Sequence, residues 1–287
     1  MKNILPLRFL LSSIIALSLF AGCTKPIKDP FNADGTVPCL VQKIIIPSGA
    51  LVASNAVKRT PYIAQRIPYK VQHTANIAPA AGDTLTFTYN TLGNPVSATH
   101  QMDIGDNLLF KYDNLNRLTD YVNIFPSNTA GDYWHKYTYD GPTSNRIIAD
   151  TAFRDFISSN GQLIDYNDID LTVFKYDTEG RISQSTEYVL GDTIVRSFTY
   201  DANGDLQGNG SIYDAMLNIH RTNTIWMFID RDYSINNPVD NGSDTYNSVG
   251  LPISISTNNT SVPPGFTFII IGYPFGITNA SIVYSCP

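Results

Sequence analysis

The fold of this chain is decided by a stretch that reads Phe174-Lys175-Tyr176-Asp177-Thr178-Glu179-Gly180-Arg181-Ile182. An aromatic-x-aromatic strand end runs into Asp, two free residues, Gly and the start of a new strand. Asp at the first position of a type I turn hydrogen-bonds to the backbone two residues later. Gly three residues later accepts the left-handed conformation that a following bulge requires. The stretch therefore predicts a β-hairpin.

The same pattern recurs along most of the chain. Its other copies begin at Tyr89-Asn90, Tyr112-Asp113, Tyr139-Asp140 and Tyr200-Asp201, with a worn copy at Tyr246-Asn247. The interval from Tyr89 to Tyr112 holds two strands of ordinary length and two turns. The interval from Tyr200 to Tyr246 is close to twice as long, so we expect a degenerate copy between them. Cys39–Ile46, an apolar run between two prolines, predicts a first strand before the repeats.

The strands of these hairpins alternate between apolar and polar side chains, which assigns their two faces. One face gathers Leu85, Phe87, Tyr89, Leu108, Phe110, Tyr112, Phe174, Tyr176, Phe198 and Tyr200; the other gathers Thr86, Thr88, Lys111, Lys136, Thr138, Lys175 and Arg196. No long helical pattern is available to cover the aromatic face, so the sheet has to curl onto itself. We predict an all-β fold: an antiparallel meander of hairpin repeats in one strongly curled, barrel-like or clam-like sheet of about a dozen strands.

The first residues indicate export. Residues 1–22 combine Lys2 and Arg8 with an apolar run that is short for a membrane span, as in a signal peptide. Leu19–Cys23 resembles the bacterial lipobox, in which the Cys is lipidated and becomes the mature N-terminus. We therefore expect a lipid anchor at Cys23, a flexible tether over 23–38 and a β domain over 39–287. The expected location is the outer membrane, lipid-anchored, facing the periplasm or the cell surface, with the membrane as a partner through the lipid.

The net charge indicates which partners are unsuitable, and the cysteines indicate a disulfide. Removal of residues 1–22 takes away Lys2 and Arg8 and no acid, so the net charge of −6 becomes −8. An acidic chain without a basic run is a poor candidate for nucleic-acid binding. Cys39 and Cys286 lie at the two ends of the domain in an oxidising compartment, which favours a disulfide between them. Two buried free thiols are the alternative.

The sequence carries no strong catalytic motif: it lacks Gly-x-Ser-x-Gly, His-Glu-x-x-His, Cys-x-x-Cys and a phosphate-binding glycine loop. Asp201–Ile212 resembles a calcium loop but has Leu206 and Ile212 where Gly and Glu are needed. We expect no catalytic residue, no cofactor and no metal. Asp165, Asp168 and Asp170 form an acidic cluster that could hold a cation or act as acid and base, but we interpret it as a solvated loop.

The weak binding candidates lie in one segment near the C-terminal repeats. They are Trp226, Asp230, Asp232 and Tyr233. Aromatic side chains could stack on a sugar or pack against a partner protein. The two carboxylates flank Arg231, an arrangement with a distant similarity to a glycosidase pair.

The copies at Tyr176 and Tyr112 are similar to the YD repeats of Rhs-type shell proteins. The whole layout resembles small lipoproteins of Bacteroidota with worn YD-like repeats, some of which are described as porin-like in fold. This resemblance implies architecture and location and no activity. The leading hypothesis is a non-enzymatic envelope lipoprotein that presents a β-sheet for binding a glycan or a protein, or for envelope structure, in an oligomeric state that the sequence leaves open. The alternatives are a glycan-acting hydrolase that uses Asp residues and a remnant of a toxin-shell protein.

Overall fold

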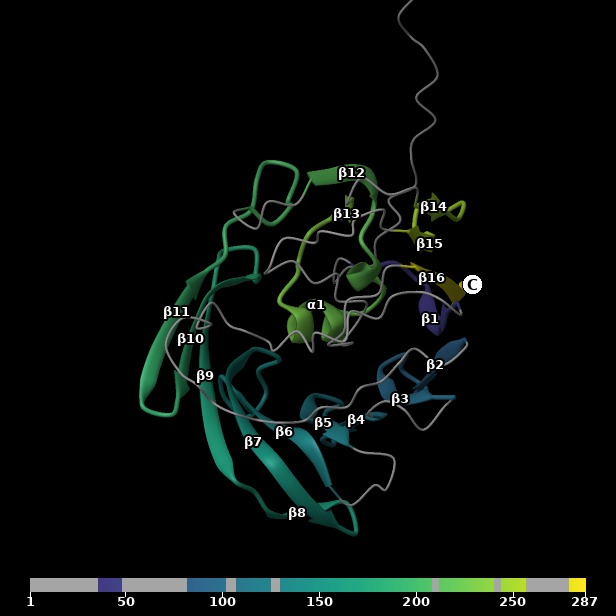
Figure 1. The fold of residues 1–287 in the computed structure, drawn as a ribbon. Helices are drawn as coiled ribbons and strands as arrows, with labels where there is room; N and C mark the ends of the chain where they lie inside the picture. Colours follow the sequence, from purple (N-terminus) through teal and green to yellow (C-terminus); the bar gives the residue numbers. More distant parts are fainter. Residues whose placement is uncertain are drawn as a thin grey trace, which may run out of the picture.

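The computed structural model describes residues 36–47, 82–101, 107–124, 130–207, 212–239, 244–256 and 279–287. The signal peptide and Cys23 lie outside these ranges, as does most of the tether. All but two of the described strands form one large sheet that curls around a short helix, α1 (Thr224–Asp230), at its centre (Figure 1). The prediction of an all-β fold built on a single curled sheet is therefore confirmed.

Fourteen strands make up the main sheet. They are β1 (Leu40–Ile46), β2 (Asp83–Tyr89), β3 (Pro95–His100), β4 (Asn107–Tyr112), β5 (Leu118–Ile124), β6 (Ala130–Tyr139), β7 (Ile147–Ser159), β8 (Gln162–Asp165), β9 (Asp168–Tyr176), β10 (Ile182–Val189), β11 (Asp192–Ser197), β14 (Thr245–Tyr246), β15 (Pro252–Ser256) and β16 (Asn279–Ser285). A separate pair joins β12 (Ile212–Leu217) to β13 (Asn236–Val239), and a 3-10 turn, η1 (Ile219–Thr222), precedes α1.

The strands follow a meander. Their order is β11-β10-β9-β7-β6-β5-β4-β3-β2-β1-β16-β15-β14, every pair is antiparallel, and β8 pairs with β7 beside this path. The sheet is open, since β11 and β14 are its ends and do not pair with each other. β1 lies between β2 and β16, and so brings the start of the described chain beside its end.

The Tyr-Asp turns are built as the sequence predicts. In the turn after β9, Asp177 Oδ1 accepts hydrogen bonds from the N–H groups of Glu179 (3.0 Å) and Arg181 (2.9 Å). Asp177 Oδ2 accepts a third from Nε of Arg181 at 2.7 Å. Gly180 has a φ of 79°, the left-handed conformation that glycine adopts without strain. The Asp, the Gly and the Arg of the motif are therefore all used by the turn itself.

Four of the motif tyrosines tie their strand to the residue that follows the preceding motif turn. The hydroxyls of Tyr112, Tyr139, Tyr176 and Tyr200 donate to the carbonyls of Pro95 (2.6 Å), Leu118 (2.9 Å), Ile147 (2.5 Å) and Ile182 (3.4 Å), the first residues of β3, β5, β7 and β10. Turn arginines stack on the next tyrosine along, with Arg117 4.4 Å from the ring centre of Tyr139 and Arg181 4.1 Å from that of Tyr200. Burial raises the pKa of Tyr139 to about 12, so its hydroxyl stays a donor. We call this row the tyrosine ladder.

Loss of one rung of the tyrosine ladder tests this account. We expect Tyr176→Phe to lower the free energy of unfolding by about 1 kcal/mol, because the carbonyl of Ile147 loses its hydroxyl donor. Tyr188→Phe is the matched control, since Tyr188 is 46% exposed on the neighbouring strand. Urea unfolding followed by fluorescence measures both. Equal midpoints for the two variants would contradict a stabilising role of the ladder.

The expected degenerate copy lies at Tyr213-Asp214. The hydroxyl of Tyr213 donates to the carbonyl of Leu206 at 3.0 Å, as in the tyrosine ladder. Asp214 Oδ1 accepts from the N–H of Met216 at 2.7 Å, as a motif Asp does. This copy belongs to the separate pair β12–β13 and not to the main sheet.

The aromatic face is the inner face of the curl, and a helix does fill it. Leu85, Phe87, Leu108 and Phe110 are buried there around Trp226 of α1. The expectation that no helix covers this face was therefore wrong. Residues 224–230 form fewer than two complete helical turns, which is too short for a periodic pattern to reveal. Asn223 starts the helix by accepting from the N–H of Ile225 at 2.8 Å.

The outer face carries most of the residues that the alternation places there, with one exception. Arg196 lies opposite Ser185, which is opposite the buried Phe174, so it is on the inner face and pairs with Glu187. Its assignment to the outer face was wrong because position 196 shares the parity of Phe198 and Tyr200.

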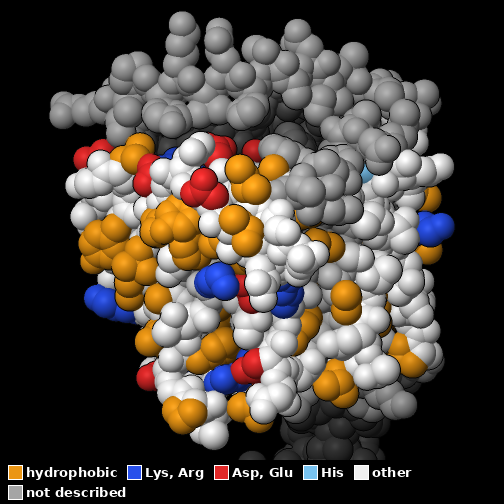
Figure 2. Space-filling model, turned by 90° about the horizontal axis from the view of Figure 1, so that it is seen from below, with side chains coloured by type: hydrophobic (Ala, Val, Ile, Leu, Met, Phe, Trp, Pro, Cys, Tyr) orange, Lys and Arg blue, Asp and Glu red, His pale blue; other side chains and the backbone are white. Residues whose placement is uncertain are grey.

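Seen from below, the surface shows scattered hydrophobic patches, and Lys or Arg side chains lie close to Asp or Glu side chains (Figure 2).

The two ends of the described chain are fastened together. Cys39 and Cys286 form a disulfide beside the β1–β16 pairing. Val37, which the sequence assigned to the tether, is buried against Cys39 and Leu251, and its N–H donates to the carbonyl of Arg221 at 2.8 Å. The packed part of the chain therefore includes Val37.

Candidate functional site

Trp226 belongs to the core and is not available for binding a sugar. Its side chain is fully buried, with edge-on ring contacts to Phe87 (centroids 5.7 Å apart) and Phe110 (5.4 Å). Two residues farther along α1, Phe228 makes edge-on ring contacts with Tyr137 and Phe174, with centroids 5.3 Å apart in each case. The helix that carries the binding candidates is thus a plug for the inner face.

Asp230 and Asp232 hold a buried histidine. His220 Nε2 lies 2.9 Å from Asp230 Oδ2, and His220 Nδ1 lies 2.7 Å from Asn218 Oδ1. The amide nitrogen of Asn218 donates to Asp232 Oδ2 at 2.9 Å, which turns its oxygen toward the histidine. Both imidazole nitrogens therefore face acceptors, which is the arrangement of a protonated ring. Burial disfavours that charge, but the hydrogen bond to Asp230 and the charges of Asp230 and Asp232 outweigh it and raise the pKa of His220.

This histidine should make stability depend on pH. A raised folded-state pKa means that the stabilisation is complete below the unfolded value of about 6.5 and is lost as the pH rises through the folded value. We expect His220→Gln to be less stable than the natural protein by a constant amount below about pH 6.5, and by less as the pH rises. Urea unfolding at a series of pH values measures this, and a difference that grows with pH would contradict it. Arg221, whose charge opposes protonation of His220, is unchanged in the variant.

Tyr233 also serves the packing around α1. It lies against the cluster of Ile147, Phe174, Ile182 and Phe228. Burial raises the pKa of its hydroxyl well above the usual value. The structure thus brings the four sequence candidates into one region, where two of them pack in the core around α1 and two hold His220.

A different set of polar side chains faces the interior where the strands extend past α1. We call it the inner charged row: His135, Asp150, Arg154, Asp168, Asp170, Glu187, Arg196 and Arg231. The strand registers place its members on one face, because Asp150 and Glu187 are both opposite Thr172, Asp170 is opposite Ala152, and Arg154 is opposite Asp168. Their side chains are between 10% (Asp150) and 37% (Asp168) exposed.

The inner charged row is held by three sets of ion pairs. His135 Nδ1 lies 2.9 Å from both carboxylate oxygens of Asp150. Arg154 bridges Asp168 and Asp170, at 3.1 Å each. Glu187 accepts from Arg231 at 2.6 Å and also from Arg196. The row therefore offers both cationic and anionic groups, held on strands of the main sheet and, for Arg231, at the C-terminal end of α1.

Asp170 is a carboxyl of the inner charged row whose pKa is raised. Burial raises its pKa, Arg154 opposes this, and the charges of Asp168 and Glu187 add to it. Its Oδ1 is buried and has no hydrogen-bond partner in the part of the chain that the structure describes. A carboxyl of raised pKa keeps its proton to a higher pH than an ordinary carboxyl, which favours a role as a proton or hydrogen-bond donor.

The sequence analysis placed two of these residues in a loop. Asp168 and Asp170 instead belong to β9 and face inward, while Asp165 is exposed at the end of β8. A signal was present: reading back from Tyr176 at every second residue gives Phe174, Thr172, Asp170 and Asp168, so one face changes from aromatic to ionisable. The pairing with Arg154 and Glu187 depends on strand register, which single-strand patterns do not fix.

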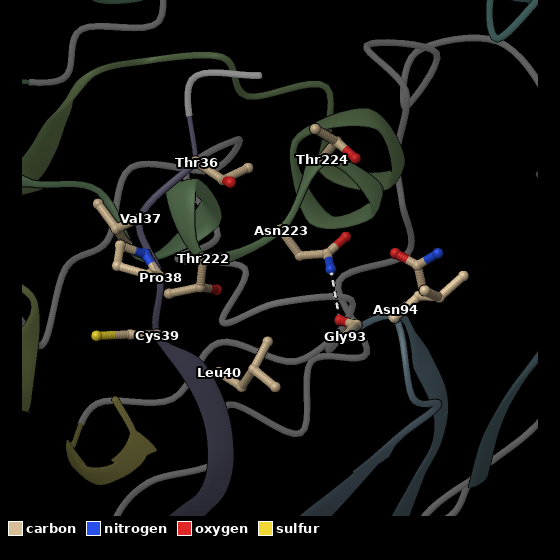
Figure 3. Close-up of a pocket in the computed structure, with 11 residues that line it drawn as sticks. Thr36, Val37, Pro38, Cys39, Leu40, Gly93, Asn94, Thr222, Asn223 and Thr224 are labelled. Carbon is tan, nitrogen blue, oxygen red and sulfur yellow. Dashed lines mark hydrogen bonds between the residues drawn. The ribbon is translucent and has the colours of Figure 1, made fainter. Parts of the chain in front are cut away.

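A second hollow of about 290 Å³ lies near the disulfide. It is lined by Thr36–Leu40, by the β2–β3 turn at Leu92–Asn94 and by Thr222–Thr224 at the start of α1 (Figure 3). The amide of Asn223 reaches across it and donates to the carbonyl of Gly93 at 2.9 Å. Its lining contains no ionisable side chain, so it can hydrogen-bond but cannot supply an acid or a base. By contrast, the hollow beside the inner charged row, lined by His135, Asp150 and Arg231 among others, measures only about 20 Å³.

Among the described residues, no three or more His, Cys, Asp or Glu side chains converge as a metal site would require. The helices in the described ranges are all too short to span a bilayer.

Comparison with known proteins gives weak structural likenesses. No family model and no curated protein matches the sequence. Two solved structures, described as "TcdB2-TccC3 without hypervariable C-terminal region" and "TcdB2-TccC3-Cdc42", superpose with TM-scores of 0.27 and 0.26 and identities of 10% and 11%. They cover 63% and 62% of this chain, and this chain spans only 9% of either of them. A porin-like protein from Bacteroides uniformis superposes with a TM-score of 0.31 and 11% identity, covering 88% of this chain and 99% of its own.

Proposed function

We propose that this protein is a non-enzymatic, lipid-anchored envelope protein whose curled sheet is a rigid scaffold for binding a polar ligand, a glycan or a protein segment, at the inner charged row. The observation that carries the proposal is the division of the inner face. The motif residues and α1 complete the core, and the ionisable residues gather beyond them. The proposed anchor rests on the Leu19–Cys23 stretch.

The composition of the inner charged row supports a binding role. Ion pairs that face a concave surface and remain partly exposed can exchange their partners for a ligand's hydroxyl, carboxylate or ammonium groups. The rigid strands reduce the ordering cost of binding. The side chains of the tyrosine ladder and its turns are used in hydrogen bonds that hold the fold. The inner charged row is therefore the largest set of ionisable side chains that the described residues place on the inner face.

The experiment is a glycan array and an envelope-protein pull-down with the chain from residue 24, which retains every described residue. Asp168→Asn and Arg154→Gln remove members of the inner charged row, and we expect binding to fall at least tenfold. Lys175→Gln is the matched control, because Lys175 is exposed on the outer face of the same strand as Asp168. Equal loss in all three variants, or binding that survives the first two, would refute this site.

A second candidate function, hydrolysis of a glycan, is favoured by one observation: the raised pKa of Asp170 beside Asp168 and Glu187. In this reading Asp170 is the general acid and a neighbouring carboxylate is its partner. Release of reducing sugar by the natural chain, abolished in Asp170→Asn while glycan binding persists, would decide for the hydrolase. Binding without turnover would decide for the scaffold.

Asp170 also gives a prediction on stability. Its raised pKa means that its charged form destabilises the folded state, so stability falls as the pH rises from the unfolded value of 3.8 through the folded value. We expect Asp170→Asn to be as stable as the natural protein, or more stable, at neutral pH, and to lose this advantage in acid. A side chain that destabilises the folded state at its own position is typical of a functional site. Thermal unfolding at two pH values measures the effect, and a less stable variant at neutral pH would contradict it.

A further inference from the structure

The sheet ends at β11, and this edge is exposed. The hairpin that joins β10 to β11 places Val189 opposite Asp192 and turns through Leu190 and Gly191, both with positive φ. All six residues of β11 are at least partly exposed, and Val195 is 56% exposed. The strand contains no Pro, no Lys and no bulge, and its protection is limited to the charged side chains of Asp192 and Arg196.

The hydrogen-bond pattern shows which backbone groups this edge presents. The N–H of Phe198 donates to the carbonyl of Ser183 at 2.9 Å, so residue 198 bonds toward β10. In an antiparallel ladder this alternates, so residues 196, 194 and 192 also bond inward. The N–H and C=O groups of Thr193, Val195 and Ser197 therefore point away from the sheet. In the described part of the chain they have no hydrogen-bond partner.

The next strand of the meander begins on this edge and then leaves it. After the turn at Asp201–Asp205, Leu206 bridges back to Tyr200, and the N–H of Gln207 donates to the carbonyl of Thr199 at 2.8 Å. Farther along, β12 pairs with β13 instead of with β11. The edge at Thr193–Ser197 therefore has room for one more hydrogen-bonded strand, and no strand of the described main sheet fills it.

We propose that a second copy of this chain supplies that strand, with the two β11 strands antiparallel about a twofold axis at Ile194. In this register Thr193 faces Val195 of the second copy, and their outward backbone groups exchange hydrogen bonds. Asp192 faces Arg196 of the second copy, which gives two symmetric pairs of opposite charge on the inner side. Ile194 meets its own counterpart at a closely spaced, non-hydrogen-bonded position.

The charges select this register over its neighbour. An axis at Val195 also satisfies the outward backbone groups, but it places Asp192 opposite Phe198 and Ile194 opposite Arg196. Both cross-copy ion pairs are then lost. The Ile194-centred register therefore makes a closed pair of chains with complementary charges, and its two sheets continue as one.

Cysteine cross-linking of the full chain in bacterial membranes tests the proposal. Ile194→Cys should give a covalent dimer with mild oxidant, several-fold more than Val195→Cys, although Val195 is the more exposed. The parent chain, with its natural cysteines, sets the background. Asp192→Lys in the Ile194→Cys chain should lower the cross-linked fraction by placing two cations opposite each other.

A backbone variant completes the test. Thr193→Pro removes an outward N–H that does not bond to β10, so the monomer keeps its ladder while the cross-link of Ile194→Cys is lost. An unchanged melting temperature shows that the variant folds. A dimer fraction equal to the parent's, or cross-linking through Val195→Cys at least as strong as through Ile194→Cys, would overturn the proposal.

Discussion

Replacing Trp226 by Ala is expected to lower the free energy of unfolding by about 3–5 kcal/mol, the usual cost of emptying a buried aromatic site. For a domain of this size this corresponds to a fall of the melting temperature of roughly 10 °C. Trp226 is fully buried, and its ring contacts Phe87 of β2 and Phe110 of β4. Its loss leaves a cavity that rigid strands cannot close.

Thermal unfolding and near-ultraviolet circular dichroism measure this effect, since the aromatic cluster around the helix contributes to the spectrum. Thr224→Ala is the matched control, because Thr224 is exposed on the same helix. It should change stability by less than about 0.5 kcal/mol. Trp226→Phe should fall between the two. If Trp226→Ala unfolded like the control, α1 would not be the plug of the inner face.

Replacing Cys39 and Cys286 together by Ser is expected to lower the free energy of unfolding by about 2–5 kcal/mol. The disulfide spans a sequence separation of 247 residues, so it restricts the unfolded chain strongly. It also lies beside the pairing of β1 with β16, which joins segments from the two ends of the chain.

Urea unfolding with and without reductant measures this contribution. Reductant should move the midpoint of the natural protein to that of the double variant and leave the double variant unchanged. Cys23→Ser is the control and should unfold like the natural protein. A double variant with the natural midpoint would show that the β1–β16 pairing holds without the bond.

Local sequence patterns were enough to predict the hairpins, the antiparallel order and most of the inner face, because each depends on neighbours along the chain. The turn at Asp177 is built from residues four apart, and the alternation that buries Phe174 has a period of two. The tyrosine spacing also predicted a further copy between Tyr200 and Tyr246, but not its position at Tyr213.

Two features became visible only in the folded structure: the helix that packs on the inner face, and the polar residues that contact one another. A seven-residue helix is too short to leave a periodic pattern, so Trp226 could be read as a binding residue when it is core. Arg154 meets Asp170, and Glu187 meets Arg231, because strand register and curvature bring distant positions together. Those contacts arise from the summed packing of the whole sheet, and no local stretch of sequence encodes them.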